Sequence, residues 1–182
     1  DGIEVMFGGG RREFYGSDFG GTRLSPEDDL VSIWAEGASN RHYISTAREL
    51  STLTADEQVL GLFSSSHMTY IAERESNTSE PELAEMTAKA IELLATRENG
   101  YFLMVEGARI DHGHHDGIAG YALLETQEFA RAVATALNAR GAAAVAALTQ
   151  LTMTRAMFAG NVGVNGTSYA AMDVLQQTAL AI

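Results

Sequence analysis

The 182-residue sequence contains no cysteine, which excludes disulfides and thiolate metal ligands. Any metal that this chain binds must therefore be held by carboxylate, imidazole or hydroxyl groups. The lack of cysteine does not indicate the cellular compartment, because it fits both a cytosolic protein and a secreted protein without disulfides.

Lysine is nearly missing as well: Lys89 is the only one, and the formal net charge is −12. A surface with this excess of negative charge repels phosphate backbones, so nucleic acid is not expected as a partner. No stretch approaches about 18 consecutive apolar residues, so no transmembrane segment is expected in this chain, and no signal peptide is recognisable. The first residues, 1–7, read as a strand already under way, which predicts that upstream sequence is missing.

The hydrophobic residues recur at the spacings of both strands and helices, which is typical of an α/β protein. The pattern predicts strands at 3–7 and 42–44, a helix from Ser25 to Gly37, a helix within 51–60, a helix over 80–97 and a helix from about residue 121. The continuous apolar run 101–105 is typical of a strand buried on both faces. We therefore expect strands 3–7 and 101–105 to be neighbours in a largely parallel sheet with flanking helices.

The composition changes near residue 140. Ten of the eighteen residues from 130 to 147 are alanine, which favours helix but offers little to pack. The sequence thus predicts a region 1–139 that carries the fold and a divergent C-terminal tail, 140–182.

A dense group of metal-binding residue types follows the apolar run. The eleven residues from Glu106 to Asp116 contain three carboxylates and three imidazoles. Aspartate and histidine suit zinc, whereas glutamate suits an oxygen-loving magnesium ion. Uncompensated burial of so many polar groups would cost several kcal/mol. A metal site is therefore expected here, although a solvated loop remains the plainer alternative.

Several short motifs occur in a definite order along the chain. They are Gly8-Gly9-Gly10-Arg11, Gly20-Gly21-Thr22-Arg23-Leu24, Arg48-Glu49-Leu50, Gly61-Leu62-Phe63 with Met68 and Tyr70, Glu85-Met86-Thr87, and Asp111-His112-Gly113-His114-His115. Their order and spacing, from Asp1 to about residue 137, resemble the central stretch of the alkaline phosphatase family, especially its animal and related bacterial branch.

The resemblance implies a phosphomonoesterase in which a serine attacks the phosphate with the help of two zinc ions and a magnesium ion. Carried over by position, it makes Glu106 a magnesium ligand, Asp111 and His115 ligands of one zinc, and His112 a contact of the phosphate substrate or of the magnesium shell. For His114 and Asp116 a supporting or surface role is the plainer interpretation, and it is the one expected here. It further implies an extracellular or periplasmic location and a homodimeric full-length parent.

Two positions resemble an additional calcium site of the animal enzymes, namely Phe63 and Glu80. Ser64 replaces the acidic ligand expected beside Phe63, and the loop that should bring another ligand is shortened. Calcium binding is therefore not expected.

The chain lacks other parts of the family pattern. It contains no Asp-Ser nucleophile motif, so no catalytic residue is assigned, and no histidine follows His115. A fragment of a longer enzyme, a degenerate copy and a shifted reading frame all explain this. The leading hypothesis is a fragment of an alkaline phosphatase; the alternatives are an inactive metal-binding or structural remnant and a related metallohydrolase that acts on diesters or sulfate esters.

Overall fold

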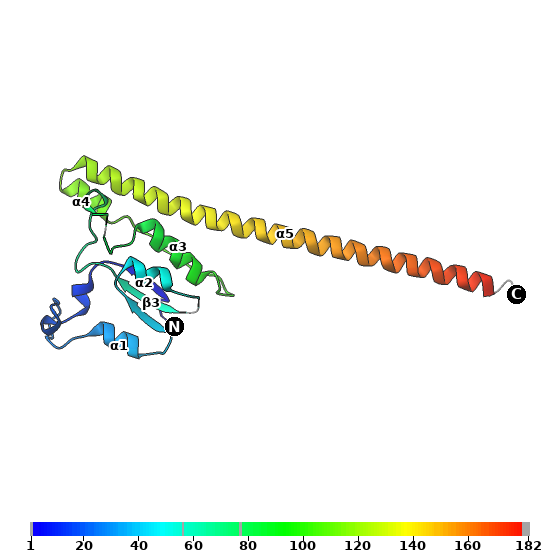
Figure 1. The fold of residues 1–182 in the computed structure, drawn as a ribbon, viewed down its shortest axis with the longest axis horizontal. Coiled ribbons are helices and arrows are strands. Elements are labelled where there is room, and N and C mark those ends of the chain that lie inside the picture. The colour runs from blue at the N-terminus through cyan, green and yellow to red at the C-terminus, as the bar shows by residue number, and fades with distance from the viewer. Residues whose placement is uncertain (1, 56, 77, 180–182) are drawn as a thin grey trace. The chain divides into compact units, whose positions relative to one another are not determined.

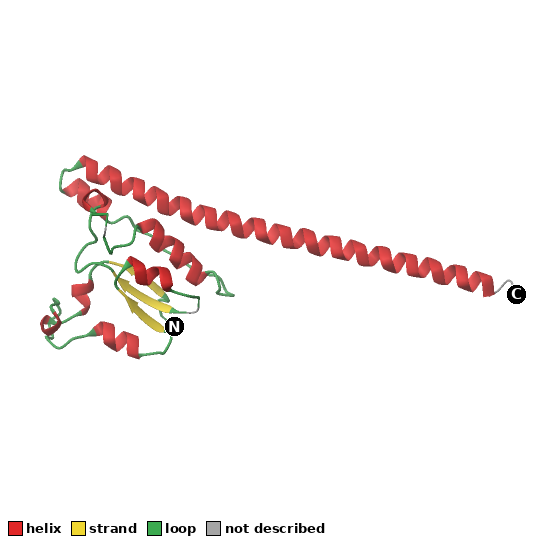
Figure 2. Cartoon of the chain, in the orientation of Figure 1, coloured by secondary structure: helices red, strands yellow, loops and turns green. Residues whose placement is uncertain are grey.

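The structure is a computed structural model that describes residues 2–179 except 56 and 77. Within these residues, three parallel strands form one sheet in the order β1-β3-β2 (Figure 2). They are β1 (Val5–Gly8), β2 (Arg41–Ile44) and β3 (Gln58–Leu62). The sheet and its flanking helices confirm the α/β class that the sequence predicts.

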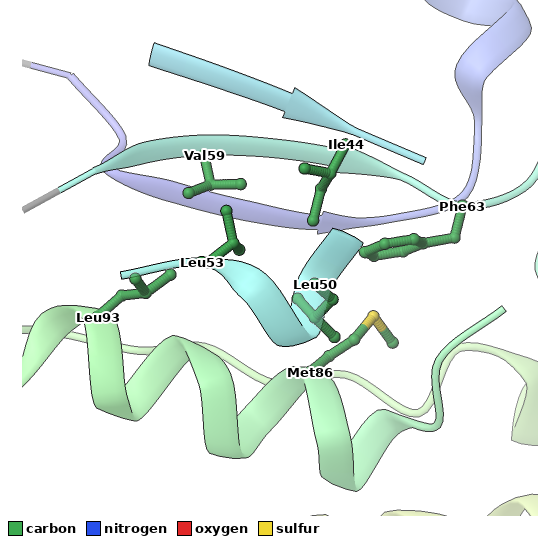
Figure 3. Packing of buried hydrophobic residues seen from close by; sticks show 7 residues of the cluster. All are labelled: Ile44, Leu50, Leu53, Val59, Phe63, Met86 and Leu93. Carbon is green, nitrogen blue, oxygen red and sulfur yellow. The ribbon is translucent and has the colours of Figure 1, made fainter. Parts of the chain in front are cut away.

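Hydrophobic side chains alternate along the central strand β3 and so build a core on each face of the sheet. Val59 points into the cluster under α2 (Ala47–Thr52) and α3 (Leu83–Leu94), which Figure 3 shows from close by. Leu60 and Leu62 join Val31 of α1 (Leu30–Glu36) in a second cluster. Helices thus cover both faces, with α1 on one side and α2 and α3 on the other (Figure 1).

The predicted helix within 51–60 is wrong. A capping box between Thr46 and Glu49 starts α2 earlier, and α2 ends at Thr52. The residues from Gln58 onward enter the sheet as its middle strand, where Val59 is only 1% exposed. The tertiary environment overrides the local pattern, because β1 and β2 supply hydrogen-bond partners on both edges of β3.

The helix predicted from Ser25 begins later than expected. The N-cap of α1 is Asp29, whose carboxylate accepts hydrogen bonds from the backbone nitrogen of Ser32 at 2.9 Å and from its hydroxyl at 2.7 Å. The end is predicted correctly, since Gly37 is the C-cap. The carbonyl of Ser25 instead accepts the backbone N–H of Asp28 in a turn.

The helix predicted over 80–97 is confirmed as the shorter α3. The Glu82 side chain and the Glu85 side chain form a capping box at its start. Met86 and Leu93, seven residues apart, point from the same side of α3 into the core (Figure 3).

The prediction of a buried strand at 101–105 is wrong. The segment forms no strand, and the side chain of Phe102 is 90% exposed while that of Met104 is 68% exposed. Within the described residues, the outer edge of β1 pairs with no strand, so the apolar run forms no ladder although an edge of the sheet is available. A run of this kind is buried only where neighbouring strands and covering layers are present.

After this segment the chain forms α4 (Arg109–His115) and then enters α5 (Ala119–Ala179). Gly113 of α4 is buried against the start of α5, where an added Cβ would lie 2.7 Å from the backbone nitrogen of Ala122. Short 3-10 helices lie at Arg11–Phe14, Ser17–Phe19 and Ile71–Glu73.

The chain divides into two compact units, Asp1–Ala139 and Arg140–Ile182. The division falls where the composition changes; that residues 140–182 are a divergent tail stays a prediction. In the described part of the chain, one helical stretch, Ala119–Met157, is long and apolar enough to cross a membrane by length and composition. One such helix is weak evidence. The expected absence of a transmembrane segment therefore stays a prediction as well.

Two buried carboxylates anchor the first part of α5 to the rest of its unit. Glu125 Oε1 accepts the backbone N–H of Ile71 at 2.7 Å, and Glu128 Oε1 accepts that of Ala84 at 3.1 Å. Ala84 lies in the first turn of α3, where a negative charge also interacts favourably with the helix dipole. Glu128 is 3% exposed and also contacts Arg131 at 3.1 Å.

Replacing Glu128 by alanine is expected to lower the free energy of unfolding by about 1–3 kcal/mol, because the amide of the half-buried Ala84 and the Arg131 guanidinium lose their acceptor. Urea unfolding followed by circular dichroism measures the change. The matched control Glu36→Ala, at an exposed position, should stay within about 0.5 kcal/mol of the parent. Equal losses in the two variants would contradict the anchoring role of Glu128.

Candidate functional site

The candidate site is built on the short helix α4 and on the segment that precedes it. The amide of Ile110 donates to the carbonyl of Gly107 as the helix begins. At the other end, Gly117 adopts a φ of 69°, and the amide of Ile118 donates back to the carbonyl of Gly113. Glycine adopts this positive φ without a steric penalty. The chain reverses its direction here, so that α4 packs against α5.

Asp111 and His115 lie one helical turn apart on α4. Asp111 Oδ2 is 3.5 Å from His115 Nε2, and the two side chains are 75% and 78% exposed. Helical i,i+4 spacing brings the pair together, and the lack of a side chain at Gly113 lets α4 pack closely against α5.

The distance between Asp111 and His115 suits two of the four ligands of a tetrahedral zinc ion. Two ligand atoms at 2.0–2.2 Å from a tetrahedral zinc ion are about 3.3–3.6 Å apart. Within the described residues, however, no group of three or more histidine, aspartate or glutamate side chains could hold a metal. The residues present therefore fit two of the ligand positions and leave the others to be supplied.

Glu106 lies outside α4, on the extended segment before it. Its side chain is exposed and lines a cavity of about 520 Å³. Val5 and Phe7 of β1, Met86 of α3 and Leu103 line the same cavity. The structure thus places Glu106 apart from the Asp111–His115 pair, while its predicted role as a magnesium ligand stays a prediction.

His112 is half-buried and has two ring contacts. Its Nδ1 lies 3.0 Å from Nη1 of Arg109, and its ring centroid lies 4.4 Å from that of His67 in an edge-on arrangement. These distances define the surroundings of the His112 ring. The predicted contact between His112 and the phosphate substrate stays a prediction.

A buried tyrosine supports this part of the site. Tyr70 is 4% exposed, and its hydroxyl donates to Asp116 Oδ2 at 2.6 Å. Burial, followed by the hydrogen bond to Asp116, raises the pKa of Tyr70 to about 12, so the hydroxyl remains protonated. The Arg109 guanidinium lies 3.4 Å from the ring centroid of Tyr70, and the Tyr121 ring packs at 4.6 Å.

His114 and Asp116 are both exposed. Exposure does not separate His114 from the proposed zinc ligands, because Asp111 and His115 are exposed as well. Asp116 accepts the hydrogen bond of the Tyr70 hydroxyl, and the expected supporting or surface roles of His114 and Asp116 stay predictions.

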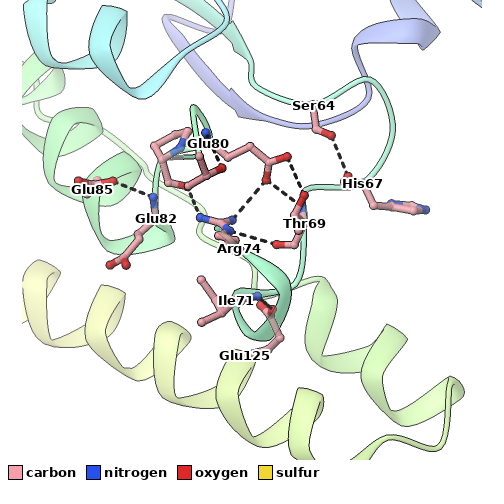
Figure 4. Close-up of polar contacts among 11 residues, drawn as sticks. Ser64, His67, Thr69, Ile71, Arg74, Glu80, Glu82, Glu85 and Glu125 are labelled. Carbon is pink, nitrogen blue, oxygen red and sulfur yellow. Dashed lines mark hydrogen bonds and ion pairs between the residues drawn. The ribbon is translucent and has the colours of Figure 1, made fainter. Parts of the chain in front are cut away.

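The loop that carries His67 and Tyr70 is held by a polar network (Figure 4). Glu80 accepts hydrogen bonds from the backbone nitrogen of Thr69 at 2.8 Å and from its hydroxyl at 3.0 Å, and it lies 3.7 Å from Arg74. Arg74 in turn donates to the carbonyls of Thr69 and Pro81. Both oxygens of Glu80, one of the two positions that resemble a calcium site, are thus engaged by protein groups.

Sequence reasoning missed two side chains of this cluster. Arg109 stands three residues before His112, a spacing that places both on one face of a helix and could have indicated the contact. His67 comes from a loop 45 residues upstream of His112. No local pattern predicts that approach, because it depends on how the loop after β3 meets α4.

Comparisons with known proteins agree with the motifs. The alkaline phosphatase family matches residues 1–171. A membrane-bound alkaline phosphatase of Bombyx mori is 43% identical over 148 residues, and the human tissue-nonspecific isozyme is 39% identical over 150 residues. These matches cover 75% and 74% of this chain, but only 27% and 28% of the two relatives.

Solved structures give the same result. The alkaline phosphatase of Thermus thermophilus is similar with a TM-score of 0.64 and 33% identity, over 76% of this chain and 28% of that protein. A mutant alkaline phosphatase from TAB5, solved with Mg bound, has a TM-score of 0.53 and 26% identity, over 68% of this chain and 34% of that protein. The chain thus spans between a quarter and about a third of the length of the proteins it matches.

Proposed function

Because the chain belongs to the alkaline phosphatase family, we propose that it is a segment of a metal-dependent phosphatase that hydrolyses phosphate monoesters. In the longer protein the reaction would pass through a phosphoserine intermediate. The observation that carries the proposal is the Asp111–His115 pair on α4, whose 3.5 Å spacing suits two ligands of one zinc ion.

Each metal is assigned to the residues whose chemistry suits it. Asp111 and His115 would hold zinc, and Glu106 would hold magnesium through an oxygen ligand. Bound zinc supplies Lewis-acid stabilisation of charge on phosphate oxygens. His112 would bind the phosphate group of the substrate from the same helix.

The chain by itself is proposed to be inactive. Its sequence contains no Asp-Ser dipeptide for a nucleophile, and no histidine beyond His115 for the remaining zinc ligands. These same absences favour the second candidate, an inactive remnant of the fold that retains partial metal binding. The longer parent is proposed to be an extracellular or periplasmic homodimer, in line with relatives described as membrane-bound and tissue isozymes.

A chimera tests the proposal. Residues 1–137 replace the matching segment of the Thermus thermophilus alkaline phosphatase, which supplies the rest of the enzyme. We expect zinc-dependent hydrolysis of p-nitrophenyl phosphate by the chimera and none by the 182-residue chain alone, because only the chimera contains a nucleophile and a full ligand set. Initial rates of p-nitrophenol release measure both.

The chimera with Asp111→Ala should lose that hydrolysis, and the chimera with Arg48→Met, at an exposed position, should retain it. A folded chimera, checked by its thermal unfolding transition, that binds zinc but shows no turnover would favour the inactive remnant. Zinc-dependent turnover by the chain alone would contradict the assignment of the nucleophile to another part of the protein.

A further inference from the structure

The contact between Arg109 and His112 determines where the proton of the imidazole lies. Arg109 Nη1 is 3.0 Å from His112 Nδ1. A guanidinium group is always charged and carries donors only, so Nδ1 must be the acceptor in this hydrogen bond. A neutral His112 therefore carries its proton on Nε2.

Arg109 is held in place from its other side by Tyr70. The guanidinium carbon lies 3.4 Å from the centroid of the Tyr70 ring, within the range of a cation–π interaction. Tyr70 is fixed in turn by its hydrogen bond to Asp116 and by the ring of Tyr121. The arginine thus rests on a buried platform and has little freedom to leave His112.

The position of Arg109 also has a cost in free energy. Arg109 Nε is buried and has no hydrogen-bond partner in the described part of the chain. A buried donor without a partner is unfavourable, and this cost offsets part of what the contacts of Arg109 with Tyr70 and His112 contribute. The edge-on His67 ring, at 4.4 Å, packs against the imidazole and restricts its rotation.

We propose that Arg109 is a positioning residue that holds His112 as the Nε2–H tautomer, so that the neutral ring offers a hydrogen-bond donor to an oxygen of the substrate's phosphate group. The hydrogen bond from His112 to the substrate rests on the proposed phosphatase function, whereas the tautomer of His112 does not. With Nδ1 engaged by Arg109 and Nε2 protonated, neutral His112 serves neither as a general base nor as a metal ligand. His112 is thereby set apart from Asp111 and His115, whose 3.5 Å spacing makes them the proposed zinc pair on α4.

Nuclear magnetic resonance of the chain with ¹⁵N-labelled histidine tests the tautomer directly. Long-range ¹H–¹⁵N correlations, recorded without metal at a pH above the histidine titration, report which ring nitrogen carries the proton. We expect a single Nε2–H form of His112 in the parent chain. Arg109→Met should move the two ring-nitrogen shifts toward each other, because the tautomers then interconvert freely.

Three further variants separate positioning from structure. Arg109→Lys should keep the Nε2–H form, since an ammonium group also only donates. Tyr70→Phe should keep it too, because the ring under Arg109 remains. Arg48→Met, at an exposed site, should leave the spectrum unchanged. An Nδ1–H form in the parent, or identical His112 shifts in the parent and Arg109→Met, would overturn the proposal.

Kinetics in the Thermus chimera provide the second readout. There, Arg109→Met should raise KM for p-nitrophenyl phosphate about tenfold, because a hydrogen bond to a charged phosphate oxygen is weakened. An inactive chimera together with a single Nε2–H tautomer would count against the phosphatase function and support the role of Arg109. If the chimera is active but Arg109→Met changes neither its KM nor the ring-nitrogen shifts of His112, the positioning role of Arg109 is refuted and the phosphatase function is not.

Discussion

Replacing Asp111 by alanine is expected to lower the zinc affinity of this chain more than about 100-fold, whereas replacing His114 by alanine is expected to change it little. Loss of a partner outside the metal's ligand set already costs about 10–100-fold in affinity, so loss of one of two ligands should cost more. Isothermal titration calorimetry with zinc chloride measures both variants against the parent.

The two substitutions form a matched pair, because Asp111 and His114 are both exposed residues of the same short helix. The Oδ2 atom of Asp111 lies 3.5 Å from Nε2 of His115. The double variant Asp111→Ala with His115→Ala should bind at least as weakly as the weaker of its single variants, since each single variant keeps one ligand of the pair and the double variant keeps none. Equal losses for Asp111→Ala and His114→Ala would contradict the assignment of the zinc pair.

Replacing Leu93 by alanine is expected to lower the free energy of unfolding by about 2–5 kcal/mol, because the side chain is 1% exposed and its loss leaves a cavity between α3 and the sheet. This is a large share of the total stability of a unit of this size. Urea unfolding followed by circular dichroism measures the change.

The chain offers a control of identical chemistry. Leu24 is fully exposed, so Leu24→Ala should stay within about 0.5 kcal/mol of the parent. If Leu93→Ala does not fold, Leu93→Met, which conserves volume, should fold and lose less than about 1.5 kcal/mol. A loss below 1 kcal/mol for Leu93→Ala would show that the cluster in Figure 3 is not a packed core.

The wrong prediction at 101–105 shows how strongly burial depends on neighbours. The run Tyr101-Phe102-Leu103-Met104-Val105 has the composition of a central strand, but two of its largest side chains are mostly exposed. Leu103 and Val105 line the same cavity as Val5 and Phe7 of β1. The chain covers only 27–28% of the curated relatives to which it is most directly compared, so we propose that other segments of the longer protein cover this surface.

The sequence by itself determined the class of the fold, the helix α3 and the identity of the metal-binding candidates. α3 could be predicted because its apolar residues recur at helical spacing and glutamates start it, which are both local properties. The candidates could be named because Glu106, Asp111 and His115 belong to one short motif. Family membership, too, rests on the order of such motifs along the chain.

Only the tertiary structure decided which residues surround them. That Gln58–Leu62 is the central strand depends on partners on both edges, whereas 101–105 forms no strand even though the outer edge of β1 is unpaired within the described residues. The approach of His67 to His112, and of Tyr70 to Arg109, joins segments about 40 residues apart. Periodicity reports contacts a few residues away, whereas these contacts arise from the packing of the loop after β3 against α4, which no local pattern encodes.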